Sequence, residues 1–126
     1  MHTKIVKKIF IVDDDQLQAA MLEDRLTREI KHQVVIYTTG EECIKHLDDQ
    51  PDIIILDYNL NSEFSGAANG IKILETIKKL DHGIRVIMLS SQEDYGVALL
   101  TVTKGAEDYV IKDETAFDKV AAICAQ

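Results

Sequence analysis

The sequence is poor in cysteine and contains no apolar run of membrane-spanning length. Its two cysteines, Cys43 and Cys124, show no metal-binding spacing and make a poor disulfide framework. Both stand beside apolar residues in helix-like segments, so we expect buried, reduced thiols. No apolar run approaches the roughly 18 residues of a membrane span, and the N-terminus lacks the apolar core and cleavage signal of a secretory peptide. We expect a cytoplasmic protein with no membrane partner.

Positive charge is also scarce. The chain of 126 residues has a formal net charge of −8 and a pI near 4.9, which argues against direct nucleic-acid binding and against docking on anionic lipid. Its 46% hydrophobic and 29% charged residues are typical of a globular protein. Without an internal repeat, a low-complexity segment or an interdomain linker, residues 1–126 are predicted to form a single domain.

Short apolar runs alternate with amphipathic segments along the chain. The runs are rich in β-branched residues and mostly lack polar alternation, as strands covered on both faces should. They span residues 9–12, 34–37, 53–56, 86–89 and 109–111. Helix candidates lie near residues 16–31, 41–48, 70–80, 93–103 and 115–125. Five such βα units predict an α/β fold with a doubly wound parallel sheet and helices on both faces.

Polar side chains follow four of the predicted strands. They are Asp13, Asp14 and Asp15 after the first strand, Asp57 after the third, Ser90 and Ser91 after the fourth, and Lys112 after the fifth. Because parallel strands end at one edge of a sheet, where open α/β folds bind their ligands, these groups should meet. We predict an acidic cup with a hydroxyl and an ammonium at its rim.

The charge of this cup favours a divalent cation. Two carboxylates about 5 Å apart repel by roughly 3 kcal/mol at an effective dielectric constant near 20, and one lysine cannot neutralise three of them. Mg²⁺ suits a few carboxylates together with a carbonyl and waters. Aspartate is also a favoured helix N-cap, and we assign that role to Asp15. Capping does not explain matched chemistry at four strand ends, so the other aspartates are predicted to bind metal.

The segments IVDDD, IIILDYNL, VIMLSSQ and GAEDYVIKD, in this order, resemble the motifs of the receiver domains of bacterial two-component response regulators. The resemblance covers essentially the whole chain. It implies a flavodoxin-like sheet of order 2-1-3-4-5 with five helices. It also implies a role in phosphorelay signal transduction, in which the domain is a phosphoprotein and a signalling module that dephosphorylates itself, and not an enzyme.

The resemblance assigns the chemistry residue by residue. Asp57 would accept a phosphoryl group from a histidine kinase or a histidine phosphotransfer protein and become an aspartyl phosphate. Asp13, Asp14, Asp57 and the backbone carbonyl of Asn59 would hold Mg²⁺. Lys112 would pair with the phosphoryl group, which agrees with the need of phosphoryl transfer for positioning and charge neutralisation. In isolation, Lys112 would be read as an ordinary solvated residue.

The resemblance also implies a switch. The Ser90 hydroxyl would hydrogen-bond the phosphoryl group, and Tyr109, otherwise a simple core aromatic, would change rotamer in response. A downstream protein would then bind the face made by the fourth helix, the fifth strand and the fifth helix. Asn59 and Gln92 would tune the rate of self-dephosphorylation.

The chain departs from the family pattern at two places. The loop 59–70 is longer than usual and lacks the usual proline; a mobile loop is the simpler interpretation, and a partner contact through Glu63 or Phe64 is the alternative. Asp113 replaces the usual proline after Lys112. A cis peptide costs about 0.5–1 kcal/mol before proline but roughly 2.5–4 kcal/mol before other residues, so we expect a trans Lys112–Asp113 bond. The histidines, without ligand spacing, are predicted at the surface: His2, His32, His46 and His82.

Three functions remain open from the sequence. The chain is a stand-alone receiver acting through protein contacts, or the regulatory domain of a longer DNA-binding transcription factor. Alternatively, Asp13-x-Asp15 followed by Ser90 and Lys112 resembles haloacid-dehalogenase-type phosphatases. That family's glycine-threonine after the acidic motif and its acidic pair after the lysine are missing here, and Asp57 would have no role.

Overall fold

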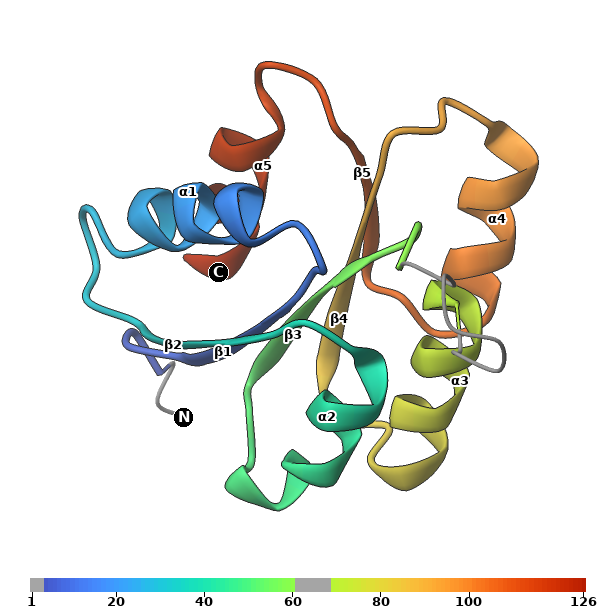
Figure 1. Ribbon diagram of the computed structural model, residues 1–126, viewed down its shortest axis with the longest axis horizontal. Helices are drawn as coiled ribbons and strands as arrows, with labels where there is room; N and C mark the ends of the chain where they lie inside the picture. Colours follow the sequence, from blue (N-terminus) through green and yellow to red (C-terminus); the bar gives the residue numbers. More distant parts are fainter. Residues whose placement is uncertain (1–3, 61–68) are drawn as a thin grey trace.

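Five parallel strands form one sheet in the order β2-β1-β3-β4-β5 (Figure 1). The computed structural model describes residues 4–60 and 69–126. The strands are β1 (Lys8–Val12), β2 (Gln33–Tyr37), β3 (Ile53–Asp57), β4 (Arg85–Ser90) and β5 (Asp108–Ile111). This confirms the predicted doubly wound fold. The expectations for His2, Glu63 and Phe64 concern residues outside the described ranges.

Helices cover both faces of the sheet (Figure 1). One face carries α1 (Gln16–Leu26) and α5 (Ala116–Cys124), which pack against each other. The other face carries α2 (Gly40–Lys45), the short 3-10 helix η1 (Leu47–Asp49), α3 (Gly70–Leu80) and α4 (Tyr95–Thr103). All strands run the same way, so their carboxyl ends lie along one edge, and the loops that follow them build the site.

The core consists of two apolar layers, one on each side of the sheet. Along β1, Ile9 and Ile11 join the layer under α1 and α5, while Phe10 and Val12 join the layer under α2 and α3. This is the period-two alternation of a strand, with an apolar residue on both faces. Consequently β1, β3 and β4 are almost wholly buried, which agrees with their uninterrupted apolar sequences.

The edge strand β2 differs from this prediction. It pairs only with β1, and Val35 is 38% exposed. The expectation of burial on both faces was therefore wrong for this strand, because a strand at the edge is covered less completely than its neighbours.

The first helix ends earlier than predicted. We expected it to continue to residue 31, but α1 ends at Leu26. The Thr27 hydroxyl donates a hydrogen bond to the Glu23 carbonyl (2.9 Å), a local bond that competes with helix continuation. The apolar residues at four-residue spacing, which included Ile30, thus predicted a longer helix than the one observed. Similarly, α2 ends at Lys45, and η1 continues the chain to a left-handed Gln50 with a φ of 60°.

One surface prediction is corrected at the opposite edge of the sheet. His32 is buried, and its Nδ1 accepts a hydrogen bond from the Lys7 backbone N–H (3.0 Å). Burial, and then the nearby Lys7 charge, lowers the pKa of His32, so its neutral form is favoured. His46 is half-buried and stacks on Tyr37, whereas His82 is exposed as expected. A lone histidine in sequence does not reveal that a backbone donor lies opposite it.

Both cysteines are buried and free, as expected. Burial raises the pKa of Cys43 to about 12 and that of Cys124 to about 11, so both thiols stay protonated. Among the described residues, no helix combines the length and the apolar character needed to cross a membrane.

Candidate functional site

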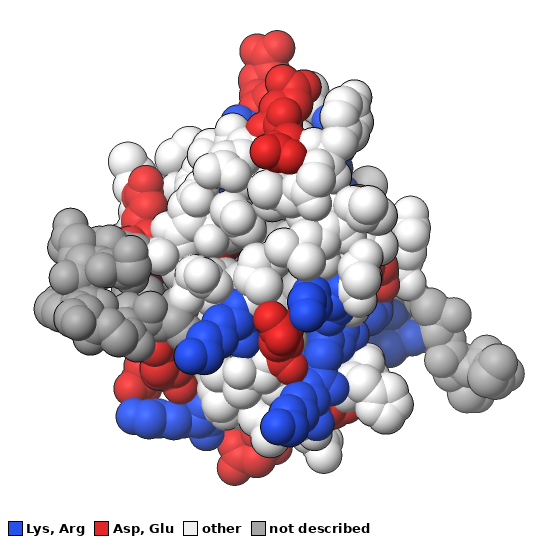
Figure 2. Space-filling model, turned by 90° about the vertical axis from the view of Figure 1, so that its right-hand side faces the viewer, with Lys and Arg blue, Asp and Glu red and all other residues white. Residues whose placement is uncertain are grey.

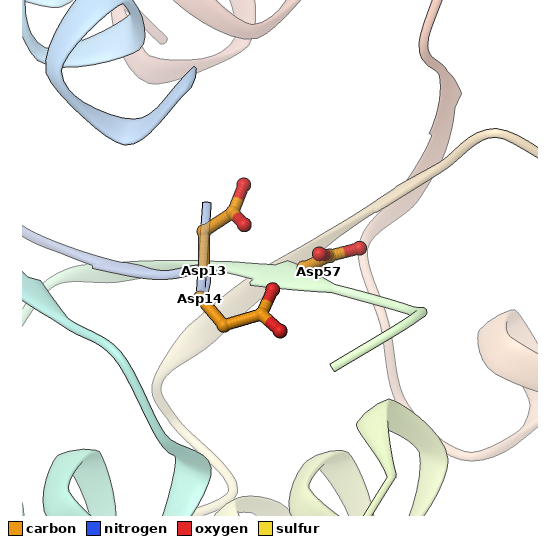
Figure 3. A group of neighbouring side chains, drawn as sticks. All are labelled: Asp13, Asp14 and Asp57. Atoms are coloured by element: carbon orange, nitrogen blue, oxygen red, sulfur yellow. The ribbon is translucent and has the colours of Figure 1, made fainter. Parts of the chain in front are cut away.

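The acidic cup predicted from the sequence is present at the carboxyl edge of the sheet. Asp13 and Asp14 follow β1, and Asp57 ends the adjacent strand β3. One carboxylate oxygen from each lies within 4.8 Å of the others. In Figure 3 the Asp13 and Asp14 carboxylates turn toward the side on which Asp57 lies. Asp13 and Asp57 are buried, and Asp14 is exposed, so the cup opens to solvent on one side.

Burial and the neighbouring carboxylate raise the pKa of Asp13. Its pKa is raised from 3.8 to about 6, first by burial and further by the neighbouring Asp57 charge and a hydrogen bond with it. The Asp15 backbone N–H donates to Asp13 Oδ1 (2.9 Å). This hydrogen bond and the charge of Lys112 lower the pKa of Asp13, but they do not cancel the rise. The metal-free cup therefore holds its negative charge at an energetic cost.

Lys112 reaches the cup from the end of β5. Its Nζ lies 3.1 Å from Asp57 Oδ1 and forms a buried ion pair, so it is not an ordinary solvated lysine. The Asn59 backbone N–H also donates to Asp57 Oδ1 (3.0 Å). Both of these bonds fall on the same oxygen of Asp57. The Asn59 amide donates to the Ser91 hydroxyl (3.1 Å), a bond that the sequence did not indicate.

Ser90 and Tyr109 both bind the backbone of one residue, Gln92. The buried Ser90 Oγ accepts a hydrogen bond from the Gln92 backbone N–H (3.0 Å). The Tyr109 hydroxyl donates to the Gln92 carbonyl (2.7 Å), while its ring packs partly against the core. Ser90 and Tyr109 thus hold Gln92 from both sides. No described hydrogen bond joins Ser90 to Asp57.

Local backbone chemistry holds the loops around the cup. Asp15 caps α1, since its side chain accepts from the Gln18 N–H (3.0 Å), which confirms the predicted capping role. The start of α3 packs closely on the loop after β3: a Cβ on Gly70 would lie 2.8 Å from the Asp57 carbonyl oxygen. Only glycine allows this approach.

Asp113 has a structural role that the sequence analysis missed. The Lys112–Asp113 peptide is trans, as predicted. Asp113 Oδ1 accepts hydrogen bonds from the Thr115 backbone N–H (2.8 Å) and hydroxyl (2.7 Å). An aspartate two residues before a threonine at a helix start is a signal for such a turn. The side chain thereby holds the turn between Lys112 and the start of α5.

Comparisons with known proteins agree with this geometry. Residues 9–123 match the family described as the response regulator receiver domain. The chemotaxis protein CheY of Thermotoga maritima is 27% identical over 107 residues, covering 84% of this chain and 85% of CheY. The transcriptional regulatory protein CpxR of Escherichia coli K12 is 31% identical over 120 residues, covering 95% of this chain but 49% of CpxR.

The fold also matches solved structures. The Mn²⁺-bound form of response regulator Rcp1 superposes with a TM-score of 0.76 at 23% identity, covering 93% of this chain and 91% of Rcp1. The chain belongs to the receiver domains of two-component response regulators. Such domains are signalling modules that interact with histidine kinases and downstream effectors. The comparisons favour neither the phosphatase nor the longer transcription factor; this chain spans about half of CpxR.

The raised pKa of Asp13 generates a test. The folded-state pKa of Asp13 lies above the unfolded value, so ionisation of Asp13 lowers the free energy of unfolding. This loss of stability is absent well below pH 3.8, grows up to about pH 6 and is complete above it. Asp13→Asn should therefore stabilise the metal-free protein above about pH 7 by about 1–3 kcal/mol. Its Oδ1 can still accept from Asp15. Urea unfolding in a chelator measures the difference.

The same substitution should have little effect well below pH 3.8, where Asp13 is protonated in both the folded and the unfolded state. Asp48→Asn, which removes an exposed carboxylate on η1, is the matched control and should show no such pH-dependent gain. An equal gain for Asp13→Asn at both pH values would contradict the crowding of the cup.

Proposed function

We propose that Asp57 is the phosphoacceptor of this receiver domain. The observation that carries the proposal is the place of its carboxylate, which lies in the cup beside Asp13 and Asp14 while its Oδ1 binds Lys112 and the Asn59 N–H. A lone pair of the Asp57 carboxylate attacks the phosphorus of a phosphohistidine, an O–P bond forms, and the N–P bond breaks with its electron pair left on the imidazole nitrogen. Asp57 is only 4% exposed, so the donor must deliver the phosphoryl group from the open side.

We also propose that Asp13, Asp14, Asp57 and the Asn59 carbonyl hold Mg²⁺. Support comes from the oxygen-only donor set and from its spacing within 4.8 Å; oxygens on one Mg²⁺ lie roughly 3–4 Å apart, so only a small contraction is needed. Rcp1 binds Mn²⁺, another hard divalent ion. A bound Mg²⁺ supplies charge neutralisation to the transferring oxygens. Lys112 adds its ammonium on the other side of Asp57.

The proposed partners are a histidine kinase or a histidine phosphotransfer protein upstream, and a protein effector downstream. We place the effector on the face formed by α4, β5 and α5, because Gln92 links Ser90 in the site to Tyr109 of β5 at the start of this face. Direct nucleic-acid binding is not part of the proposal, given the net charge of −8. The cytoplasmic location and the absence of a membrane partner stay predictions.

Self-dephosphorylation is part of the proposed cycle. Asn59 and Gln92 stand at the two loops that border the cup. Their polar side chains can orient a water for attack on the acyl phosphate. The resulting loss of phosphate returns the domain to its resting state without a second protein.

Replacement of the phosphoacceptor tests the main proposal. Asp57→Asn preserves size and removes the nucleophilic carboxylate, so labelling by a small phosphodonor with Mg²⁺ should vanish while the fold persists. Intact-mass measurement detects the added phosphoryl group, and alkaline treatment should release it from the wild type. Asp15→Asn, which retains a capping side chain, is the control and should label normally. Labelling of Asp57→Asn at the wild-type rate would refute the assignment.

A second prediction concerns the lifetime of the acyl phosphate. Asn59→Leu and Gln92→Leu should each slow its hydrolysis severalfold, because an apolar side chain cannot orient water; general-base positioning of this kind contributes about 10²-fold or more when complete. The decay of intact-mass signal after removal of the donor measures the rate. If both variants decay like the wild type, these residues do not tune the reaction.

A third prediction concerns the switch. A phosphoryl group on Asp57 should draw the Ser90 hydroxyl away from the Gln92 N–H, and the loosened Gln92 carbonyl should release Tyr109 to rotate toward the core. Structures with and without a phosphoryl mimic would show this change. Tyr109→Phe, which lacks the hydroxyl that holds Gln92, should uncouple the loop from the site. Ser90 and Tyr109 in unchanged positions in both structures would argue against the coupling.

A further inference from the structure

The helix α4 carries an apolar stripe on its outer surface. Tyr95, Leu99 and Val102 follow helical spacing and are 94%, 69% and 49% exposed, and the helix contains no charged residue. Its one buried side chain is Thr101. A surface helix normally turns its apolar residues to the core, so the outward stripe indicates a contact that the isolated domain leaves open.

A basic flank borders the stripe on one side. On α3, Lys72, Glu75 and Lys79 follow each other at three- and four-residue spacing on the exposed side of the helix. The Lys104 ammonium at the end of α4 lies 3.8 Å from Glu75, which brings α4 and α3 together at this point. Within the described residues, the ammonium groups of Lys72 and Lys79 have no ion-pair partner. Three lysines around one glutamate leave a local positive charge on a chain whose net charge is −8.

The charge on this face changes from one end to the other. Glu93 and the N-cap Asp94 stand at the start of α4, and Lys104 stands at its end. Figure 2, which views the molecule from this side, shows red groups at the top, a largely uncharged area in the middle, and below it most of the blue groups with red groups among them. Acidic groups of a partner would be attracted to the lysine-rich end of this surface.

We propose that α3 and α4 together bind an amphipathic helix of a protein partner, whose apolar stripe packs on Tyr95, Leu99 and Val102 and whose acidic residues face Lys72, Lys79 and Lys104. Helix-on-helix docking uses such anchors at i, i+4 and i+7. Charge complementarity sets the orientation, with the acidic end of the partner at Lys104. The inference deepens the proposed function, since it specifies the chemistry of the effector and adds α3 to the face.

A synthetic peptide pair tests this surface directly. One labelled peptide carries leucines at i, i+3, i+4 and i+7 with flanking glutamates, and its twin carries lysines in place of the glutamates. Fluorescence anisotropy with the full chain should show tighter binding of the acidic peptide. Lys72→Glu with Lys79→Glu should weaken it by about five- to tenfold, at about 0.5–1 kcal/mol per exposed charge pair, and Leu99→Ser should weaken binding of both peptides.

The control is Lys31→Glu with Lys45→Glu, which makes the same change in net charge at exposed lysines on other elements and should leave binding almost unchanged. Equal affinity for both peptides, no binding, or equal loss in the control would overturn the proposal. Lysine-dependent binding of anionic vesicles without peptide binding would overturn it in favour of a membrane surface. Phosphorylation of the same variants at Asp57 should stay normal; failure of wild-type labelling would instead refute the proposed function.

Discussion

Three carboxylates at one edge of a parallel sheet repel one another, and the rest of the site is arranged around that repulsion. Asp13 and Asp57 are buried and within reach of Asp14, and burial together with the neighbouring Asp57 charge raises the pKa of Asp13 to about 6. Lys112 offsets part of the charge from β5. The three carboxylates together offer the oxygen donors that a hard divalent cation prefers, and the proposed phosphoryl transfer would make use of such a cation.

The same crowding connects the site to the surface. Ser90 is buried beside the cup, and its hydroxyl accepts a hydrogen bond from the Gln92 N–H. The carbonyl of Gln92 in turn accepts a hydrogen bond from the Tyr109 hydroxyl. A ligand that draws Ser90 away changes a hydrogen bond on the same residue that holds the Tyr109 hydroxyl. The start of α4 lies only a few residues after Gln92 along the chain. A change of charge at Asp57 that moves Gln92 would therefore also reach the helix with the outward apolar stripe.

Departures from the family pattern are accommodated by ordinary local chemistry. Asp113 stands where many receivers have proline, and its carboxylate binds the Thr115 N–H and hydroxyl at the beginning of α5. The bond that follows Lys112 is trans, and the ammonium still reaches Asp57. At the opposite edge, Lys7 and Arg85 donate to the last carbonyls of α5, which secures that helix far from the chemistry.

The sequence by itself determined the class of fold and the members of the acidic cup, because apolar runs of strand length and polar strand ends are local patterns. It also identified the Asp15 cap and the two buried thiols. Only the tertiary structure decided that α1 stops at Leu26, that His32 is buried against the Lys7 N–H, and that β2 is half-exposed. Those outcomes depend on which residues lie opposite in space. The pairing of Ser90 and Tyr109 on Gln92, and that of Lys104 with Glu75, likewise follow from packing between distant segments.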